Sequence, residues 1–408
     1  MRKKLLRGYA RLIALSGANV QPDQEVFIGA GLDQPEFVTL LVEECYKAGA
    51  KKVVVEWNCQ AVSKLHYQYR SLKTLSKLDS YELARWKHYA KVLPARIYLT
   101  GEDPDGFAGM DMEKMSKSQR KLFPIIKPYR DAMENKYQWC IAAVPGAAWA
   151  KKLFPDDTKA AAVEKLWKAI LAASRADGPD PVKTWEEHNR SMKEHCAKLN
   201  ALGIKSLHYT AANGTDFTVG LIPQGRFCGG AEDTLGGVTF NPNIPTEECF
   251  TSPMKGEAEG IVYATKPLSY QGQLIDGFWI RFREGKAVEW HADKNEDVLA
   301  KLIGMDPGSA YLGECALVPY TSPINLSGIL FYNTLFDENA VCHLALGRGF
   351  PDCIEGFEEM TQDEIHKLGV NDSFVHCDFM IGSEDLAIDA TLRNGSVVPV
   401  FRNGVWAI

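Results

Sequence analysis

The chain has 408 residues, of which 46% are hydrophobic and 24% charged, with a formal net charge of −6. This composition is that of an ordinary globular protein, so it excludes intrinsic disorder as the overall character, and the length predicts two domains. The negative charge argues against a broad nucleic-acid-binding surface, so we expect no nucleic-acid partner.

The first residues are basic like a secretion signal, but their apolar pattern is different. Apolar residues recur at helical spacing between Leu5 and Ile13, and Arg7 and Arg11 interrupt them, so we expect an amphipathic helix. No apolar run approaches the ~18 residues of a transmembrane helix. The ten cysteines include no CxxC pair, which is typical of reduced thiols. We therefore predict a cytoplasmic protein without a membrane partner.

The first half alternates strand-like and helix-like segments. Helical patterns cover residues 36–48 and 61–90, and two charged amphipathic helices fill residues 158–202. Short apolar strands are predicted between them, at residues 25–30, 52–57, 95–100 and 138–144. Apolar strands separated by helices favour a mostly parallel α/β sheet. We assign residues 1–205 to an N-terminal α/β domain.

After residue 205 turn residues become frequent and strand patterns dominate. Helices are predicted only at residues 295–303 and 361–368. The predicted strands are residues 215–221, 260–264, 278–282, 288–292 and 374–380. This half, residues 206–408, is predicted to be a strand-rich α+β domain that carries the catalytic metal-binding site described below, and the protein as a whole is predicted to belong to the α/β class.

Three motifs suggest functions that the rest of the sequence does not support. Lys114-Met-Ser-Lys-Ser matches the KMSKS loop of class I aminoacyl-tRNA synthetases, but no HIGH-type signature follows the first strand, so we interpret it as a solvated helix start. Gly29-x-Gly31 lacks the third glycine of a dinucleotide turn. His188 and His195 lie among charged helical residues, and we expect them on a wet surface.

Four segments of the second half place Glu, His and Asp in apolar or turn-like surroundings: residues 243–251, 311–318, 335–347 and 374–380. In a strand, His376 and Asp378 share one face and Cys377 points to the other. Glu314 lies among apolar neighbours, so it too is expected to be buried. Buried ionisable groups need partners, and a metal ion is an efficient one.

Imidazole and carboxylate ligands without thiolates suit divalent ions such as Zn, Co, Mn or Mg. The number of candidate ligands exceeds what one open catalytic ion takes, and it fits two ions that share a carboxylate. Four cysteines border these ligands, and we interpret them as small core side chains: Cys249, Cys315, Cys342 and Cys377. Each motif alone also fits a core histidine or a structural ion pair; together they favour a dinuclear metal hydrolase.

Five blocks carry a more specific signal: Asn243-Ile-Pro-Thr-Glu-Glu, Leu312-Gly-Glu-Cys-Ala-Leu-Val, Thr334-Leu-Phe-Asp-Glu-Asn-Ala, His343-Leu-Ala-Leu-Gly and His376-Cys-Asp. With these blocks, in this order, the sequence resembles the aminopeptidase T / aminopeptidase S family of thermophilic-type metallopeptidases. Supporting likeness at residues 16–24, 138–140, 149–150 and 215–221 extends it over nearly the whole chain.

The resemblance implies a dinuclear metal-dependent aminopeptidase that removes N-terminal amino acids from peptides and forms a homodimer. By motif position, it implies these metal ligands: Glu248, Glu314, His343, His376 and Asp378. Glu314 would bridge the two ions. Glu338 also falls at a family site position, where it is either a further ligand or the general base.

One position departs from the family. Seven residues after the motif histidine, members commonly carry a tyrosine thought to assist catalysis, and here that residue is Phe350. Phe cannot donate a hydrogen bond to an oxyanion, and losing one such donor costs on the order of 100–1000-fold in rate. Arg348 is an alternative donor. The alternatives to an active aminopeptidase are a weakly active or non-catalytic metal- or peptide-binding protein, and a dinuclear hydrolase of another substrate.

Overall fold

The computed structural model describes residues 2–270 and 272–408 and divides them into two compact units. Unit 1 consists of residues 1–187 with 231–245, and unit 2 of residues 188–230 with 246–408. Each unit therefore contains one short segment from the other half of the chain. The domain boundary at 205/206 stays a prediction. Among the described residues, no helix is long and apolar enough to cross a membrane.

Unit 1 is built on a five-stranded sheet in the order β2-β1-β3-β4-β9, and all of its strand pairs are parallel. The strands are β1 (Glu25–Gly31), β2 (Lys52–Asn58), β3 (Ala95–Thr100), β4 (Trp139–Ala143) and β9 (Asn243–Ile244). The four strands predicted in the first half are thus confirmed, together with their parallel pairing. The fifth strand, β9, comes from the second half and was not predicted.

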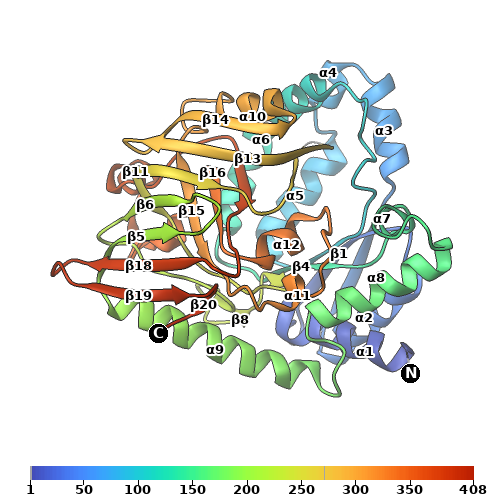
Figure 1. Cartoon of the computed structure of the whole chain (residues 1–408). Coiled ribbons are helices and arrows are strands. Elements are labelled where there is room, and N and C mark those ends of the chain that lie inside the picture. Colours follow the sequence, from blue (N-terminus) through green and yellow to red (C-terminus); the bar gives the residue numbers. More distant parts are fainter. Residues whose placement is uncertain (1, 271) are drawn as a thin grey trace. The chain divides into compact units, whose positions relative to one another are not determined.

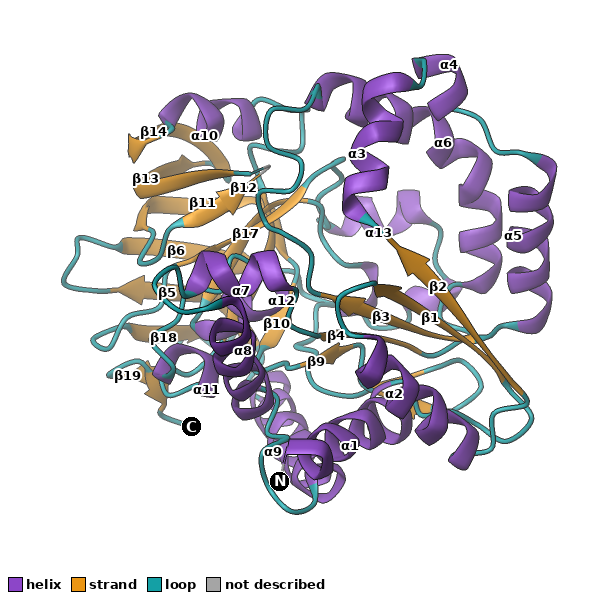
Figure 2. Ribbon diagram, turned by 90° about the vertical axis from the view of Figure 1, so that its right-hand side faces the viewer, coloured by secondary structure: helices purple, strands orange, loops and turns teal. Residues whose placement is uncertain are grey.

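Helices cover both faces of this sheet. The amphipathic helix α1 (Arg2–Leu12) continues into a π-helical turn, Ile13–Gly17, and contacts α2 (Pro35–Lys47). On the other face, Tyr89 and Met133 pack with Phe27 of β1. Figure 2 shows α1 and α2 on one side of the sheet and α5 and α6 on the other. The remaining helices are α3 (Gln60–Tyr69), α4 (Leu72–Leu75), α5 (Ser80–Val92), α6 (Met112–Met133), α7 (Ala147–Leu153) and α8 (Lys159–Ala173). Unit 1 also contains a hairpin of two short antiparallel strands, β7 (Glu232–Asp233) and β8 (Thr239–Phe240).

The KMSKS-like motif lies in the first turns of α6. Asp111 caps this helix by accepting a hydrogen bond from the backbone N–H of Lys114. The Lys114 ammonium group donates to the carbonyl of Tyr67 at 2.6 Å. The interpretation of the motif as a helix start is confirmed.

Unit 2 contains a nine-stranded antiparallel sheet and a four-stranded antiparallel sheet. The larger sheet has the order β12-β13-β11-β6-β5-β18-β19-β20, with β14 paired to β13. Its strands are β5 (Ile204–Thr210), β6 (Asp216–Leu221), β11 (Pro253–Tyr263), β12 (Leu268–Tyr270), β13 (Gln273–Arg283), β14 (Lys286–Lys294), β18 (Ala387–Leu392), β19 (Val397–Arg402) and β20 (Val405–Trp406). In Figure 1 this sheet appears as the stack from β14 down to β19.

The smaller sheet has the order β10-β15-β16-β17. Its strands are β10 (Cys249–Thr251), β15 (Leu312–Leu317), β16 (His343–Gly347) and β17 (His376–Met380). The helices of unit 2 are α9 (Pro181–Ala201, which begins in unit 1), α10 (Glu296–Ile303), α11 (Pro323–Leu326), α12 (Thr334–Asp337) and α13 (Gln362–Leu368), with 3₁₀ turns at Glu338–Ala340, Pro351–Cys353 and Phe357–Glu359. The strand-rich character predicted for this half is confirmed.

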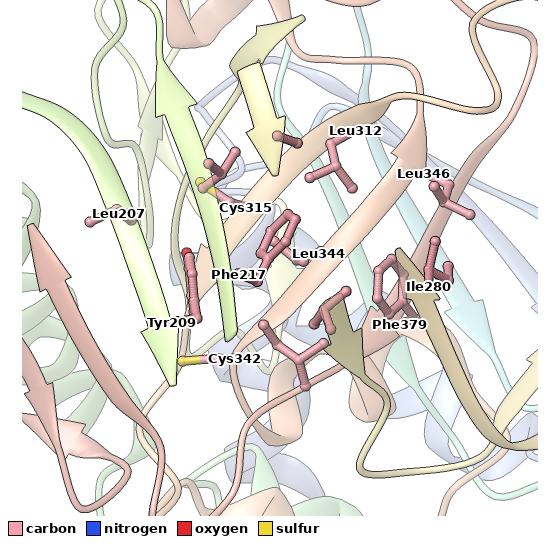
Figure 3. Close-up of a cluster of buried hydrophobic side chains, with 14 of the residues drawn as sticks. Leu207, Tyr209, Phe217, Ile280, Leu312, Cys315, Cys342, Leu344, Leu346 and Phe379 are labelled. Atoms are coloured by element: carbon pink, nitrogen blue, oxygen red, sulfur yellow. The ribbon is translucent and has the colours of Figure 1, made fainter. Parts of the chain in front are cut away.

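The core of unit 2 contains side chains from both sheets. Tyr209 and Phe217 of the larger sheet are fully buried in one cluster with Leu344 and Phe379 of the smaller one. Figure 3 shows these side chains together. One face of the four-stranded sheet is therefore committed to the apolar core, and alternation sends every second residue to its other face.

Candidate metal centre

The site residues lie on the face of the four-stranded sheet that is opposite the apolar core. On β15 Cys315 and Leu317 belong to the core, and on β17 Cys377 and Phe379 do. Because successive side chains in a strand alternate, Glu314, His376 and Asp378 are directed to the other face. The same alternation applies to His343 beside Leu344, and to Glu248 just before Cys249. The interpretation of the neighbouring cysteines as core side chains is confirmed.

The strand register leaves a gap between two of the carboxylates. Ala345 of β16 pairs with Glu314 on one side and with Asp378 on the other. Its side chain is fully buried and lies outside the apolar cluster. Across three neighbouring strands, the small side chain of Ala345 therefore lies between the acidic side chains of Glu314 and Asp378. The alanine leaves room above the sheet for the two carboxylates to converge.

The four nitrogen–oxygen contacts among the candidate ligands all involve a histidine Nε2, and they form two groups. In the first, His343 Nε2 lies 3.2 Å from Glu248 Oε2 and 3.9 Å from Glu314 Oε1. In the second, His376 Nε2 lies 3.1 Å from Glu314 Oε2 and 3.2 Å from Asp378 Oδ1. In each group the candidate ligand atoms lie within 4.8 Å of one another. Glu314 belongs to both groups, with one oxygen toward each histidine.

Each histidine is oriented by a backbone carbonyl. Nδ1 of His343 lies 3.3 Å from the carbonyl oxygen of Val341, and Nδ1 of His376 lies 2.7 Å from that of Arg348. In a neutral ring, donation of Nδ1–H to a carbonyl leaves Nε2 unprotonated, which is the tautomer that binds a metal ion. Both Nε2 atoms are the ones directed at the carboxylates.

The loop after β16 holds the carbonyl that orients His376. The backbone N–H of Arg348 donates to Val375, that of Gly349 to the Asn371 carbonyl, and that of Phe350 to Ser252 Oγ at 2.7 Å. Gly313 is required where β15 passes this loop, because a Cβ there would lie 2.1 Å from the Arg348 carbonyl oxygen. The loop is therefore fixed beside His376.

Phe350 lies next to a candidate ligand. Its ring centroid is 4.8 Å from that of His376 and 5.5 Å from that of Phe250. The Arg348 side chain is exposed, and the contact of this residue with His376 is made by its main chain. The departure from the family pattern at position 350 thus falls in direct contact with the site.

Glu338 lies beside the two groups without belonging to either of them among the described residues. It begins the 3₁₀ turn after α12, and this turn contacts β17. Asn339 connects two site segments: its amide donates to Glu338 Oε1 at 3.3 Å, and its Oδ1 accepts from the backbone N–H of Glu247 at 2.7 Å. Asn339 thereby ties the segment of Glu338 to that of Glu248.

The pKa values show how strongly the acids influence one another. Burial raises the pKa of Glu314 to about 7, with contributions from the charges of Glu248 and Asp378. Burial also raises the pKa of Glu338 well above its usual value, and the charges of Asp378 and Glu248 add to this. For His343, burial alone would lower the pKa, but contacts with Glu248 and Glu314 outweigh it and raise the pKa to about 10.

These residues fit divalent cations. Four carboxylates gather at the site, those of Glu248, Glu314, Glu338 and Asp378. For Glu314, Glu338 and Asp378, burial has the largest influence on the pKa, followed by the neighbouring acids and histidines. Buried like charges are unfavourable without a compensating cation. Asp378 Oδ1 is buried and accepts no hydrogen bond within the described part of the chain. A carboxylate oxygen in that position is a ready metal ligand.

Two features of the site were not expected from the sequence. His188 is not on a wet surface: its side chain is 10% exposed, and its Nε2 lies 2.8 Å from the Thr246 carbonyl oxygen, so it supports the segment of Glu248. The expectation of a wet surface was wrong because burial of a helix face depends on tertiary packing. Asn339 was missed as a connecting residue, although it stands beside Glu338 in the family motif.

The fold and the site together define a protein with a buried carboxylate–histidine centre suited to divalent cations. Residues 2–406 match the thermophilic metalloprotease (M29) family, and the chain belongs to this family. It is 39% identical to Aminopeptidase 2 of Geobacillus stearothermophilus, over 99% of this chain and 98% of that protein. It is 40% identical to aminopeptidase AmpS of Bacillus subtilis (strain 168), over 98% of each.

A solved structure supports the fold over its whole length. Wild-type AmpT from Thermus thermophilus matches with a TM-score of 0.91 at 36% identity, covering 100% of both chains. The mixed architecture predicted from the sequence, a parallel sheet followed by a strand-rich half, agrees with this structure. The resemblance to the aminopeptidase T / aminopeptidase S family is confirmed.

Proposed function

We propose that this protein is a metal-dependent aminopeptidase that removes N-terminal amino acids from peptides and works with two divalent cations. Family membership and the aminopeptidases among its relatives support the enzyme class. The observation that carries the dinuclear proposal is the position of Glu314, whose two oxygens face the two histidines separately. One carboxylate placed in this way is suited to bridge two ions.

We assign the ligands by their groups. Glu248, Glu314 and His343 would hold one ion, and Glu314, His376 and Asp378 the other. Together with Glu338, the site contains four carboxylates, whose four negative charges match two divalent cations. Zn, Co, Mn and Mg all accept nitrogen and oxygen ligands, so the metal is defined here as a divalent cation of this class.

When bound, the cations supply Lewis acidity that polarises the scissile carbonyl and acidifies the attacking water. The residues of the chain supply positioning and proton transfer. Glu338 accepts the proton of the water, since it borders both groups and its carboxylate is steadied by Asn339. The Arg348 carbonyl keeps His376 in its metal-binding tautomer. Phe350 contributes its ring alone, and no hydroxyl.

An aminopeptidase must recognise the free α-ammonium group of its substrate. The acidic site is complementary to this group, and a blocked N-terminus removes the charge. The test compares aminoacyl substrates with their N-acetylated forms, each with and without a chelator. We expect cleavage of the free forms only, loss of cleavage on chelation, and recovery on adding Zn, Co or Mn. Equal cleavage of both forms, or cleavage that chelation leaves unchanged, contradicts the proposal.

Metal analysis separates the alternatives. Two ions per chain with turnover of peptides fits the proposal, and one ion per chain removes the dinuclear part of it. Bound metal with no turnover on a peptide library identifies the non-catalytic alternative, which is motivated by a phenylalanine beside His376 where the family pattern has a tyrosine. Turnover of phosphoesters but not of peptides identifies a hydrolase of another substrate. A homodimer and a cytoplasmic location are further parts of this proposal, and light scattering tests the first of them.

A further inference from the structure

A small pocket opens beside the metal centre, within unit 2. Two acids of the site, Glu338 and Asp378, line it. Met380 and Ser269 line it as well. On β17 Met380 shares the face of His376 and Asp378, because Phe379 belongs to the apolar core. On β12 Leu268 belongs to the core, so Ser269 is directed away from it.

The pocket has the size of a small side chain. Its volume is about 40 Å³. On this measure one water needs roughly 10–15 Å³, so the space corresponds to about three waters. A methyl or isopropyl group fits such a space, whereas an aromatic ring requires the walls to move.

One wall of the pocket is held in an unusual conformation. Tyr332 lines the pocket with a φ of 53°, a value that bulky residues rarely adopt. The carboxylate of Asp337 holds the residues on both sides of it, accepting from the backbone N–H of Phe331 at 2.8 Å and of Asn333 at 3.0 Å. Backbone of this kind persists where the surroundings enforce it, which is common at ligand sites. The wall is therefore built before any ligand arrives.

We propose that this pocket is the subsite for the first residue of the peptide substrate, and that it selects small uncharged side chains such as those of Ala and Val. The inference rests on the proposed function and adds its substrate class. The acids at the pocket favour the residue that carries the free ammonium group. The same acids disfavour Glu and Asp as first residues, and the thioether of Met380 limits the length of the side chain.

The test uses metal-loaded protein and p-nitroanilides of Ala, Val, Leu, Phe and Glu. The wild type should prefer Ala and Val, and cleave the Phe and Glu substrates at least 10-fold less efficiently. Met380→Ala enlarges the pocket. It should raise kcat/KM for the Phe substrate relative to that for the Ala substrate on the order of 10-fold or more, because a size difference of a few methylene groups changes substrate discrimination by that much in other pockets. Ser269→Leu fills the pocket and should lower the ratio of Val to Ala by a similar factor.

Met192→Ala is the matched control. Met192 is buried to 6% exposure in the core of unit 2, close to the 3% of Met380, and does not line the pocket. Both methionine variants should lose thermal stability, and only Met380→Ala should change the substrate ratios. Metal content, measured in every variant, confirms that the centre is intact.

The outcomes separate the inference from the function on which it rests. No turnover of any substrate by the wild type contradicts the proposed function and, with it, the subsite. Turnover with the same substrate ratios in the wild type, Met380→Ala and Ser269→Leu refutes the subsite alone. If Met380→Ala does not fold, the Val to Ala ratio of Ser269→Leu decides, because Ser269 is only partly buried and its replacement is better tolerated.

Discussion

Replacing Ala345 by valine should weaken metal binding although Ala345 is not a ligand. Ala345 pairs with Glu314 on one neighbouring strand and with Asp378 on the other. Neighbouring strands lie about 4.8 Å apart, so the backbones of the two acids are separated by roughly 9.6 Å. Their carboxylates nevertheless both lie within 3.2 Å of His376 Nε2, so they lean toward each other over Ala345.

Valine adds two methyl groups at the point where the carboxylates converge. Adding such groups to a tightly packed site typically costs about 1–3 kcal/mol. If this cost falls on the metal-bound form, affinity drops roughly 5- to 150-fold. Valine is a favourable residue in strands, so the sheet itself should persist.

The assay is competition with a chelator, followed by metal analysis of the desalted protein. Ala390→Val is the matched control, since Ala390 is a fully buried alanine of β18 in the apolar core. Both variants should lower the melting temperature, and Ala345→Val alone should lower metal affinity. Full metal content at wild-type chelator resistance in Ala345→Val would refute the placement of the ions above this residue.

Three further predictions follow from the geometry. Glu338→Gln should retain bound metal and lose turnover by about 100- to 10,000-fold if Glu338 is the proton acceptor; loss of an ion in metal analysis would make it a ligand instead. Phe350→Tyr should raise kcat by up to about 100-fold at unchanged metal content, because it restores a donor beside His376; Arg348→Ala should change kcat little, and a severe loss would show that its side chain is the donor. In the chelated protein, the folded state binds protons more tightly than the unfolded state, since the pKa of Glu314 is raised to about 7 and that of His343 to about 10. The protonated Glu314 therefore stabilises the fold fully below pH ~4.5, and the protonated His343 below ~6.5, and each contribution is lost as pH rises through the pKa in the folded state. The melting temperature of the chelated protein should fall between pH 5 and 9. Parallel melting curves against pH for chelated and metal-loaded protein would contradict this.

Local patterns in the sequence were sufficient for the orientation of the site. The period of two in a strand placed His376 and Asp378 on one face with Cys377 on the other, and the structure confirms this division. Alternation depends on backbone geometry alone, so it needs no knowledge of the neighbouring strands. The four strands of unit 1 were predictable as short apolar segments, together with the helical patterns at residues 36–48 and 61–90, whereas most of α6 was not predicted.

Long-range features were not predictable from local patterns. Strand β9 joins the parallel sheet of unit 1 from the second half of the chain, and its two residues carry no pattern of their own. The two groups share Glu314 because β15 lies between β10 and β16, which is a property of strand order. His188 is buried because of what packs against its helix. Each of these depends on contacts between residues far apart in sequence.

The four-stranded sheet has acids on a buried face, which needs a reason beyond the stability of the fold. The core-facing residues of the four-stranded sheet are apolar, and a stable fold alone would be served by apolar residues on its other face as well. Hydrogen bonds position the site residues without any ion: Asn339 Oδ1 accepts from the backbone N–H of Glu247, next to Glu248, and the Arg348 carbonyl contacts Nδ1 of His376. Cations that bind this arrangement stabilise the folded chain by mass action, since the unfolded chain does not present the ligands together. We therefore expect folding and metal binding to be linked, because the buried acids that destabilise the metal-free chain are the ones proposed to bind the cations.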